Sequence, residues 1–351
     1  MVGLLTRKHF GPIGVDIGSR SIKLLQFDRE RARIQETAHW DLPPDISNST
    51  ELRDQQIVDA IGHARRGRNF RGKRAVFCLG ADNLFVQNIR VAKASGDELK
   101  KIVHFEAAGR VPFAGEEAEV RYVEAADVRQ GDTLRREVIL LACHRPAIER
   151  ILGIAERSGL VSEAIDVEPA ALLRCYCRQF RRDNDQQRRM MFVNIGASTT
   201  TVVIAKGSDA MFVKCIDVGG KHLDEGVAKR LKMSLPDATA LRRHNGDRRA
   251  DQRDAEVTRG ISEATRPILE QLANELSLCT RYYSVTFRGQ PLSKIVFGGG
   301  EASQTLVDWV AERFDTTCEL GDPLRSYEKP QTLGRLGQWD VAAGLALRGT
   351  N

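Results

Sequence analysis

The sequence has no long hydrophobic run, because none of its apolar stretches approaches the roughly 20 residues that span a bilayer. Its N-terminal stretch holds one pair of leucines followed by basic residues, so no secretory signal core is expected. Charge of one sign is also scarce, since 53 basic and 47 acidic residues give a net charge of +6 and the basic residues are scattered. We therefore expect no transmembrane segment and no nucleic-acid partner.

Closely spaced cysteines are missing as well. The chain has 7 cysteines, and the only close pair is Cys175 and Cys177. One residue between two cysteines is too few for a usual zinc knuckle. Most of the cysteines fall in apolar stretches, so we expect buried free thiols in a reducing, cytoplasmic compartment.

The chain does contain an informative stretch at residues 12–28. Ile13, Val15 and Ile17 alternate with small or polar residues, which predicts a half-buried strand, and a second strand restarts after a Gly-Ser-Arg-Ser turn. Such a turn presents backbone N–H groups and hydroxyls to a phosphate, and a carboxylate beside phosphates suits Mg²⁺ held through water. The candidate phosphate ligands are Gly18, Ser19, Ser21 and Lys23, and the candidate metal carboxylate is Asp16. A single turn of this kind is more often an ordinary hairpin.

The same pattern returns at residues 191–205. Asp16 aligns there with Asn194, and the turn glycine and the hydroxyl residues coincide too. Two copies of a phosphate-cradling hairpin indicate a two-lobed clamp in which each lobe presents one turn to the same polyphosphate. The candidate ligands in the second turn are Gly196, Ala197, Ser198 and Thr199.

Two glycine clusters follow the second hairpin. Gly219 and Gly220 open a helix and allow the backbone to approach a ligand closely. Three consecutive glycines, Gly298, Gly299 and Gly300, stand at the carboxyl end of a strand, where they leave room for a flat ring. The alternative for the triple glycine is a strand-to-helix turn without a ligand.

An acid pair precedes a helix at residues 166–173. Pro169 suits the first turn of that helix, and Asp166 and Glu168 stand beside it. One of the two acids would orient the water that attacks a terminal phosphate, and the alternative is a helix-capping pair.

The length of 351 residues and the 42% hydrophobic share predict two or more packed domains. We expect a first lobe with a returning helix, an inserted small module and a second lobe, and an exposed polar loop over residues 242–254. The expected bounds are 11–74 and 158–188 for the first lobe with its closing helix at 339–349, 75–157 for the inserted α+β module, and 189–338 for the second lobe.

Taken in order, these pieces resemble the actin-like ATPase superfamily and, within it, the PilM family of type IV pilus assembly proteins, which are relatives of the cell-division protein FtsA. The motifs that carry the resemblance are Gly-Pro-Ile-Gly-Val-Asp-Ile-Gly-Ser-Arg-Ser-Ile-Lys at 11–23, Asp-Val-Glu-Pro-Ala-Ala-Leu at 166–172, Asn-Ile-Gly-Ala-Ser-Thr-Thr-Thr at 194–201, Val-Gly-Gly-Lys-His-Leu at 218–223 and Val-Ala-Ala-Gly-Leu-Ala-Leu-Arg at 341–348. The implied α/β fold is the actin-like ATPase fold, with two ribonuclease-H-like lobes and an inserted small α+β domain.

The resemblance implies ATP between the lobes, with both turns on its phosphates and the triple glycine beside the adenine. Asp16 would support Mg²⁺ through water, and Glu168 would place the attacking water. The chain departs from the family at Asn194, where an aspartate is usual. Losing that carboxylate predicts weaker Mg²⁺ binding and at most weak ATPase activity.

The resemblance also implies a partner. In this family the inserted module presents a groove to the cytoplasmic N-terminal segment of an inner-membrane protein, PilN, within the pilus assembly complex. We expect this groove around residues 104–123, where His104, Phe105, Val111, Phe113 and Tyr122 cluster. The alternatives are a related secretion-system scaffold without nucleotide and a small-molecule kinase of the same fold, for which Glu168 is the nearest candidate base.

Overall fold

The computed structural model describes residues 10–28, 30, 33–44, 49–180, 183–248, 250–288, 290–328 and 333–348. The chain forms two compact units, which comprise residues 1–84, 143–179 and 322–351, and residues 85–142 and 180–321. No helix within the described ranges is long and apolar enough to cross a membrane.

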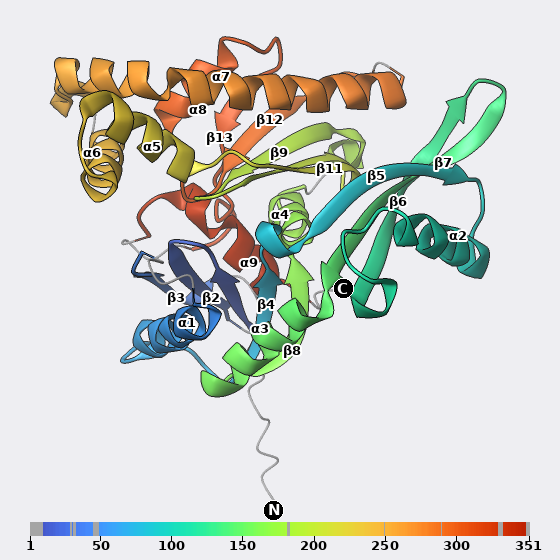
Figure 1. Ribbon diagram of the computed structural model, residues 1–351, viewed down its shortest axis with the longest axis horizontal. Coiled ribbons are helices and arrows are strands. Elements are labelled where there is room, and N and C mark those ends of the chain that lie inside the picture. Colours follow the sequence, from blue (N-terminus) through green and yellow to red (C-terminus); the bar gives the residue numbers. More distant parts are fainter. Residues whose placement is uncertain are drawn as a thin grey trace, which may run out of the picture. The chain divides into compact units, whose positions relative to one another are not determined.

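The first unit is built on a five-stranded sheet in the order β3-β2-β1-β4-β8 (Figure 1). Its strands are β1 (Ile13–Ile17), β2 (Ser21–Phe27), β3 (Ile34–Asp41), β4 (Arg74–Leu79) and β8 (Val161–Val167). Its helices are α1 (Thr50–Arg65), α3 (Arg145–Arg157), α4 (Glu168–Cys177) and α9 (Asp340–Ala346). The strands β1, β2 and β3 pair antiparallel, and β4 and β8 continue the sheet in parallel from β1.

The second unit repeats this topology in a sheet ordered β11-β10-β9-β12-β13. Its strands are β9 (Arg189–Ile195), β10 (Thr200–Lys206), β11 (Asp209–Ile216), β12 (Lys294–Gly298) and β13 (Cys318–Leu320). Its main helices are α5 (Gly220–Leu231), α6 (Leu235–Asp247), α7 (Ala255–Thr286) and α8 (Gln304–Ala311). Again an antiparallel three-strand meander is extended by two parallel strands, which is the duplication expected of two ribonuclease-H-like lobes.

The apolar patterns in the sequence account for the second sheet and its long helix. The strand β9 reads as a continuous apolar run and is buried along nearly its whole length, as strands covered on both faces are. One stripe of α7, including Leu272, Leu276 and Tyr283, packs in the same core. Asp254 caps α7 by accepting hydrogen bonds from two backbone N–H groups of its first turn.

A smaller sheet, ordered β5-β7-β6, belongs to the second unit. It consists of β5 (Phe85–Ala92), β6 (Ala118–Gln130) and β7 (Thr133–His144), with α2 (Gly96–Ala108) alongside it (Figure 1). The sequence assigned residues 75–157 to this module, but β4 lies between β1 and β8 in the first sheet. The apolar run of β4 suits a central parallel strand buried on both faces, so the insertion begins after it.

Hydrogen bonds around one buried carboxylate, Glu137, connect the small sheet to α7. Glu137 on β7 is fully buried, and it accepts hydrogen bonds from Arg90 on β5, at 2.8 Å, and from the Tyr282 hydroxyl on α7. Arg90 also donates to the Thr286 hydroxyl at 2.8 Å. These contacts explain why residues 85–142 form one compact unit with the second sheet.

Two other segments differ from the sequence expectation. Residues 242–247, expected in an exposed loop, are the last turns of α6, which Ser234 caps by accepting from the Asp237 backbone N–H. Residues 322–328 and 333–338, expected in the second lobe, lie in the first unit. Leu324 and Leu333 pack there with Phe27, so burial of apolar side chains places this segment.

Close backbone packing joins α4 and α9 in the first unit. A Cβ atom added to Gly344 on α9 would lie 1.9 Å from the carbonyl oxygen of Ala171 on α4, which no side chain tolerates. Arg174 on α4 donates a 2.7 Å hydrogen bond to the Gly344 carbonyl. The small residues of α9 are therefore required by packing.

This contact gives a stability prediction. Gly344→Ala should lower the free energy of unfolding by at least about 2 kcal/mol, because the added methyl group overpacks against backbone. Gly62→Ala on α1 is the matched control, since nothing lies within 4 Å of its Cβ position. There, alanine should stabilise the helix by roughly 0.5–1 kcal/mol. Urea unfolding of both variants checks the pair, and equal stability of the two would contradict the packing assignment.

Candidate functional site

The two predicted turns have the same backbone geometry. The Gly18 N–H donates to the Ser21 carbonyl at 3.0 Å, and the Gly196 N–H donates to the Thr199 carbonyl at 2.9 Å. In each hairpin the residue before the glycine pairs with the residue four positions after that glycine, Ile17 with Ile22 and Ile195 with Thr200. The internal repeat in the sequence is therefore a repeat of structure.

In the first unit, Asp16 and Lys23 form a buried ion pair. They are cross-strand partners on β1 and β2, and their Oδ2 and Nζ atoms are 2.9 Å apart. Burial alone would lower the pKa of Lys23, but the charge and hydrogen bond of Asp16, with the charges of Asp340 and Glu168, raise it overall. The lysine is thus held as a cation next to the proposed metal carboxylate.

Glu168 is the first residue of α4 and lies close enough to act electrostatically on Lys23. The neighbouring Asp166 instead pairs with Arg174 at 2.9 Å and with Arg348 at 2.8 Å. The helix cap is Val167, and no side chain caps it. Asp166 therefore connects β8 to α4 and to the C-terminal segment through ion pairs. Neither Asp166 nor Glu168 caps the helix.

Asp340, the first residue of α9, is a member of this cluster that the sequence reasoning missed. It is 1% exposed, and its Oδ1 accepts a 2.8 Å hydrogen bond from the Val341 backbone N–H. Its Oδ2 has no hydrogen-bond partner in the described part of the chain. Burial raises the pKa of Asp340 to about 8, against the lowering effects of the Val341 N–H and Lys23. The sequence did contain a signal for this residue, namely a single acidic residue in a helix of otherwise small and apolar residues.

The raised pKa of Asp340 makes stability depend on pH. Between about pH 4 and pH 8 the folded state keeps a proton on Asp340 that the unfolded chain releases, so the carboxyl's contribution to stability falls as pH rises through this window. Asp340→Asn has no carboxyl group to ionise, so its free energy of unfolding should no longer show the part of the decrease between about pH 4 and pH 8 that Asp340 causes. Urea unfolding at several pH values measures it, with the exposed Asp82→Asn as the control. An unchanged pH slope in Asp340→Asn would show that the carboxyl is ionised in the folded protein.

In the second unit, three separate glycine motifs meet. The Gly220 N–H donates to the Gly196 carbonyl at 3.0 Å, and the Lys221 N–H donates to the Ala197 carbonyl at 2.7 Å. The Glu301 N–H, just after the triple glycine, donates to the Ile195 carbonyl at 3.1 Å. The hairpin turn, the double glycine and the triple glycine therefore form one junction.

The glycines at this junction differ in what they do. Gly299 has a φ of +93°, and a Cβ atom there would lie 2.3 Å from both the side-chain oxygen of Asn194 and the Ile195 carbonyl. Glycine is thus required by the backbone conformation and the close approach. Gly300 has nothing within 4 Å of its Cβ position, which leaves open space beside the turn. Asn194 is buried against the Gly299 turn.

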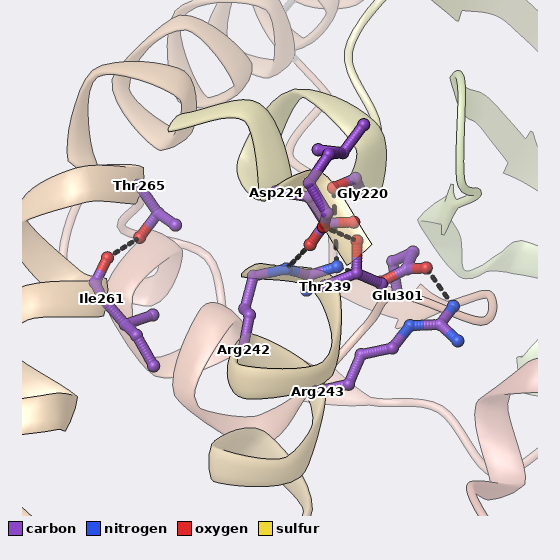
Figure 2. Close-up of polar contacts among 9 residues, drawn as sticks. Gly220, Asp224, Thr239, Arg242, Arg243, Ile261, Thr265 and Glu301 are labelled. Carbon is purple, nitrogen blue, oxygen red and sulfur yellow. Dashed lines mark hydrogen bonds and ion pairs between the residues drawn. The ribbon is translucent and has the colours of Figure 1, made fainter. Parts of the chain in front are cut away.

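A buried ion network adjoins this junction (Figure 2). Glu301 accepts from Arg242 at 2.7 Å and from Arg243, both on α6, and Arg242 also pairs with Asp224 on α5. Burial favours the neutral form of Glu301, but the charges and hydrogen bonds of the two arginines lower its pKa to about 2. This network was not predicted, because the polar composition of residues 242–254 is typical of an exposed loop. The signal was the Ser234-Leu-Pro-Asp237 helix start.

The residues present fit a magnesium–nucleotide ligand in their chemistry. Asp16 and Glu168 supply carboxylate oxygens, the ligand type that Mg²⁺ prefers, and both lie within electrostatic reach of Lys23. No group of three or more His, Cys, Asp or Glu residues is arranged to hold a metal ion in the ranges that the structure describes. A metal held mainly through water and phosphate, as proposed for Asp16, needs no such cage.

Comparison with known proteins identifies the family. A model of the type IV pilus assembly protein PilM matches residues 14–350. The chain belongs to the PilM family. This membership confirms the family resemblance found in the sequence.

Solved structures confirm the fold of this PilM family member. The chain is 23% identical to one in a PilM–PilN type IV pilus biogenesis complex, with a TM-score of 0.78 over 97% of this chain and 99% of that one. It is 15% identical to the ethanolamine utilization protein EutJ of Carboxydothermus hydrogenoformans, with a TM-score of 0.59 over 99% and 92% of the two chains. A Bacteroides thetaiotaomicron protein described as having an actin-like ATPase fold is 7% identical, with a TM-score of 0.52 over 98% of each chain. The fold is thus actin-like.

Proposed function

We propose that this PilM family member is an ATP-binding scaffold that docks the N-terminal segment of a PilN-like membrane protein during type IV pilus assembly. The observation that carries nucleotide binding is the junction of three glycine motifs in the second unit, together with the matching hairpin turn in the first. Backbone turns of this kind bind phosphate through N–H groups without needing a positive side chain. Docking beneath the inner membrane would occur through the partner.

The proposal assigns a role to each part of the site. The turn residues Gly18, Ser19 and Ser21 would hold phosphates in the first unit, and residues 196–199 would do so in the second. Mg²⁺, when bound, would neutralise phosphate charge, and Asp16 would orient its water ligands. Gly219 and Gly220 would let the backbone approach the ligand, and the open space beside Gly300 would accept the flat base.

Weak or absent hydrolysis follows from two features of the chain. Asn194 supplies an amide where a carboxylate is usual, which removes one negative charge from the metal site. Its side-chain oxygen lies against Gly299, in the glycine junction. Glu168 is then the remaining candidate for placing a water near the terminal phosphate, and nucleotide would act mainly as a ligand that shifts conformational populations.

Calorimetry with ATP and Mg²⁺ tests nucleotide binding. Asp16→Ala should weaken Mg-ATP binding about tenfold or more, because the variant loses the carboxylate that orients the metal's water ligands. Asp59→Ala, an exposed acid on α1, is the control and should bind as the unmodified protein does. Equal affinity of Asp16→Ala would contradict the metal assignment. Absence of binding by the folded, unmodified protein would favour a scaffold without nucleotide.

The exposed face of α2, which lies alongside the small sheet, supports partner docking. Phe105 on α2 is 80% exposed, which is unusual for a large apolar side chain and typical of an interaction site. The adjacent His104 is also exposed. Val111 and Tyr122 pack partly into the core beneath α2 and so support the surface. The solved PilM–PilN complex shows that a structure of this fold can assemble with PilN.

The docking surface is tested with a peptide of the N-terminal cytoplasmic segment of the same organism's PilN-like protein. Phe105→Ser should weaken peptide binding at least tenfold while leaving the melting temperature unchanged, since the side chain is exposed. Val285→Ser on α7, which alters a valine that is 75% exposed, is the control. Fluorescence anisotropy with a labelled peptide measures both. An equal loss of peptide affinity in both variants would contradict the assignment of α2 as the docking surface.

A further inference from the structure

A buried arginine holds the turn between β1 and β2 from one side. Arg53 lies in the first turn of α1 and is 9% exposed. Its Nη2 atom donates a hydrogen bond to the carbonyl of Ser19, in the middle of the turn. Its Nη1 atom donates at 2.8 Å to the carbonyl of Pro43, in the segment that follows β3. One guanidinium therefore connects α1 to the turn and to the end of β3.

The second unit satisfies the equivalent carbonyl with backbone alone. Ala197 has the place of Ser19 in the repeated hairpin, and its carbonyl accepts a 2.7 Å hydrogen bond from the Lys221 N–H in the first turn of α5. Because α5 follows β11 as α1 follows β3, the corresponding helix supplies the donor in both units. Residues 217–219 separate β11 from α5, whereas residues 42–49 separate β3 from α1. In the first unit a long side chain thus makes the contact that a helix N–H makes in the second.

Holding the Ser19 carbonyl also fixes the direction of a neighbouring N–H group. Ser19 and Arg20 are joined by a trans peptide bond, in which the carbonyl and the following N–H point in opposite directions. Because Arg53 draws the carbonyl toward α1, the Arg20 N–H is directed away from α1. Anion-binding turns work by pointing successive N–H groups to one side. A peptide that rotated here would instead present its carbonyl oxygen, which repels phosphate.

We propose that Arg53 is a positioning residue for the first phosphate turn, and that its guanidinium keeps the Ser19 carbonyl turned away from the nucleotide. This inference rests on the proposed nucleotide function and adds to that site a residue that acts through the turn rather than by touching the ligand. The geometry of the guanidinium is the essential property, because its two nitrogens reach two different carbonyls.

Two measurements on the full chain test this role, calorimetric titration with Mg-ATP and amide hydrogen exchange without ligand. Arg53→Met keeps a long side chain but removes the donors, so Mg-ATP affinity should fall at least about tenfold. The Gly18 N–H, which bonds across the turn, should exchange at least about tenfold faster, because the turn opens more often. Either an unchanged affinity or an unchanged exchange rate in the folded variant would overturn the inference.

Arg150→Met on α3 is the matched control. Arg150 donates at 2.6 Å to Asp54, the neighbour of Arg53 on α1, so this variant also removes a guanidinium that is bound to α1. Its melting temperature should fall, while Mg-ATP affinity and Gly18 exchange should each change less than about threefold. Equal losses of affinity in Arg150→Met and Arg53→Met would show that the stability of α1, and not the Ser19 contact, sets binding. That result would overturn the inference.

A second variant covers the case in which Arg53→Met does not fold. Arg53→Lys keeps the positive charge, but one ammonium group does not reproduce the planar fork, so Mg-ATP affinity should fall at least about threefold. Full affinity in Arg53→Lys would show that charge alone matters and would contradict the inference. If the unmodified protein binds no Mg-ATP, the proposed nucleotide function fails first. If it binds and the folded Arg53 variants bind equally well, that function stands and the inference alone fails.

Discussion

One backbone hydrogen bond, made twice, sets the geometry on which both units depend. In each hairpin a glycine N–H returns to the carbonyl three residues later, across a turn of small residues. A side chain would crowd this contact, since a Cβ atom at Gly18 or Gly196 would lie 3.1 or 2.9 Å from the accepting carbonyl oxygen. The turn fixes the register of the strands on either side. Each sheet then extends in the same way, with one more antiparallel strand and two parallel strands.

The same demand for close backbone approach recurs where helices meet the sheets. Gly219, Gly220 and Gly299 each have neighbouring chain where a side chain would be. In the first unit Gly14 has the Ala342 carbonyl of α9 at 2.1 Å from its Cβ position, and Gly344 meets α4 in the same manner. Small residues at these points let helices lie directly against strands and against one another. Gly219, Gly220 and Gly299 lie near the carboxyl end of β9, and the carboxyl ends of strands are where open α/β folds place ligands.

Features that depend on short-range pattern were predictable from the sequence. The hairpins and the order of motifs follow from strand alternation and glycine spacing, which are local properties. The limits of the inserted module were not, because β4 reads as a strand in either assignment and its place is decided by pairing with β1 and β8. A local pattern does not say which sheet a strand joins.

The parts of the site that escaped prediction are buried charges. Asp340 lies in an apolar helix, and its importance appears only when α9 packs beside Lys23 and Glu168. Arg242 and Arg243 lie in a segment whose polarity is typical of loops, yet their charges are neutralised by Asp224 and Glu301 within the fold. A buried ion pair is made by residues distant in sequence, so composition over a short window misreads it as solvent-exposed.

The two copies of the hairpin have kept their backbone and diverged in charge. The first copy carries Asp16, paired with Lys23, while the second carries Asn194, turned toward Gly299. The cationic groups of the second unit come instead from α6 and are engaged by Glu301. The backbone of the turn is thus what the fold requires, and the side chains around it are free to differ. On the proposed function, the metal carboxylate belongs to the first unit and the second unit has an amide in its place, which suits a protein that uses nucleotide as a ligand more than as a substrate.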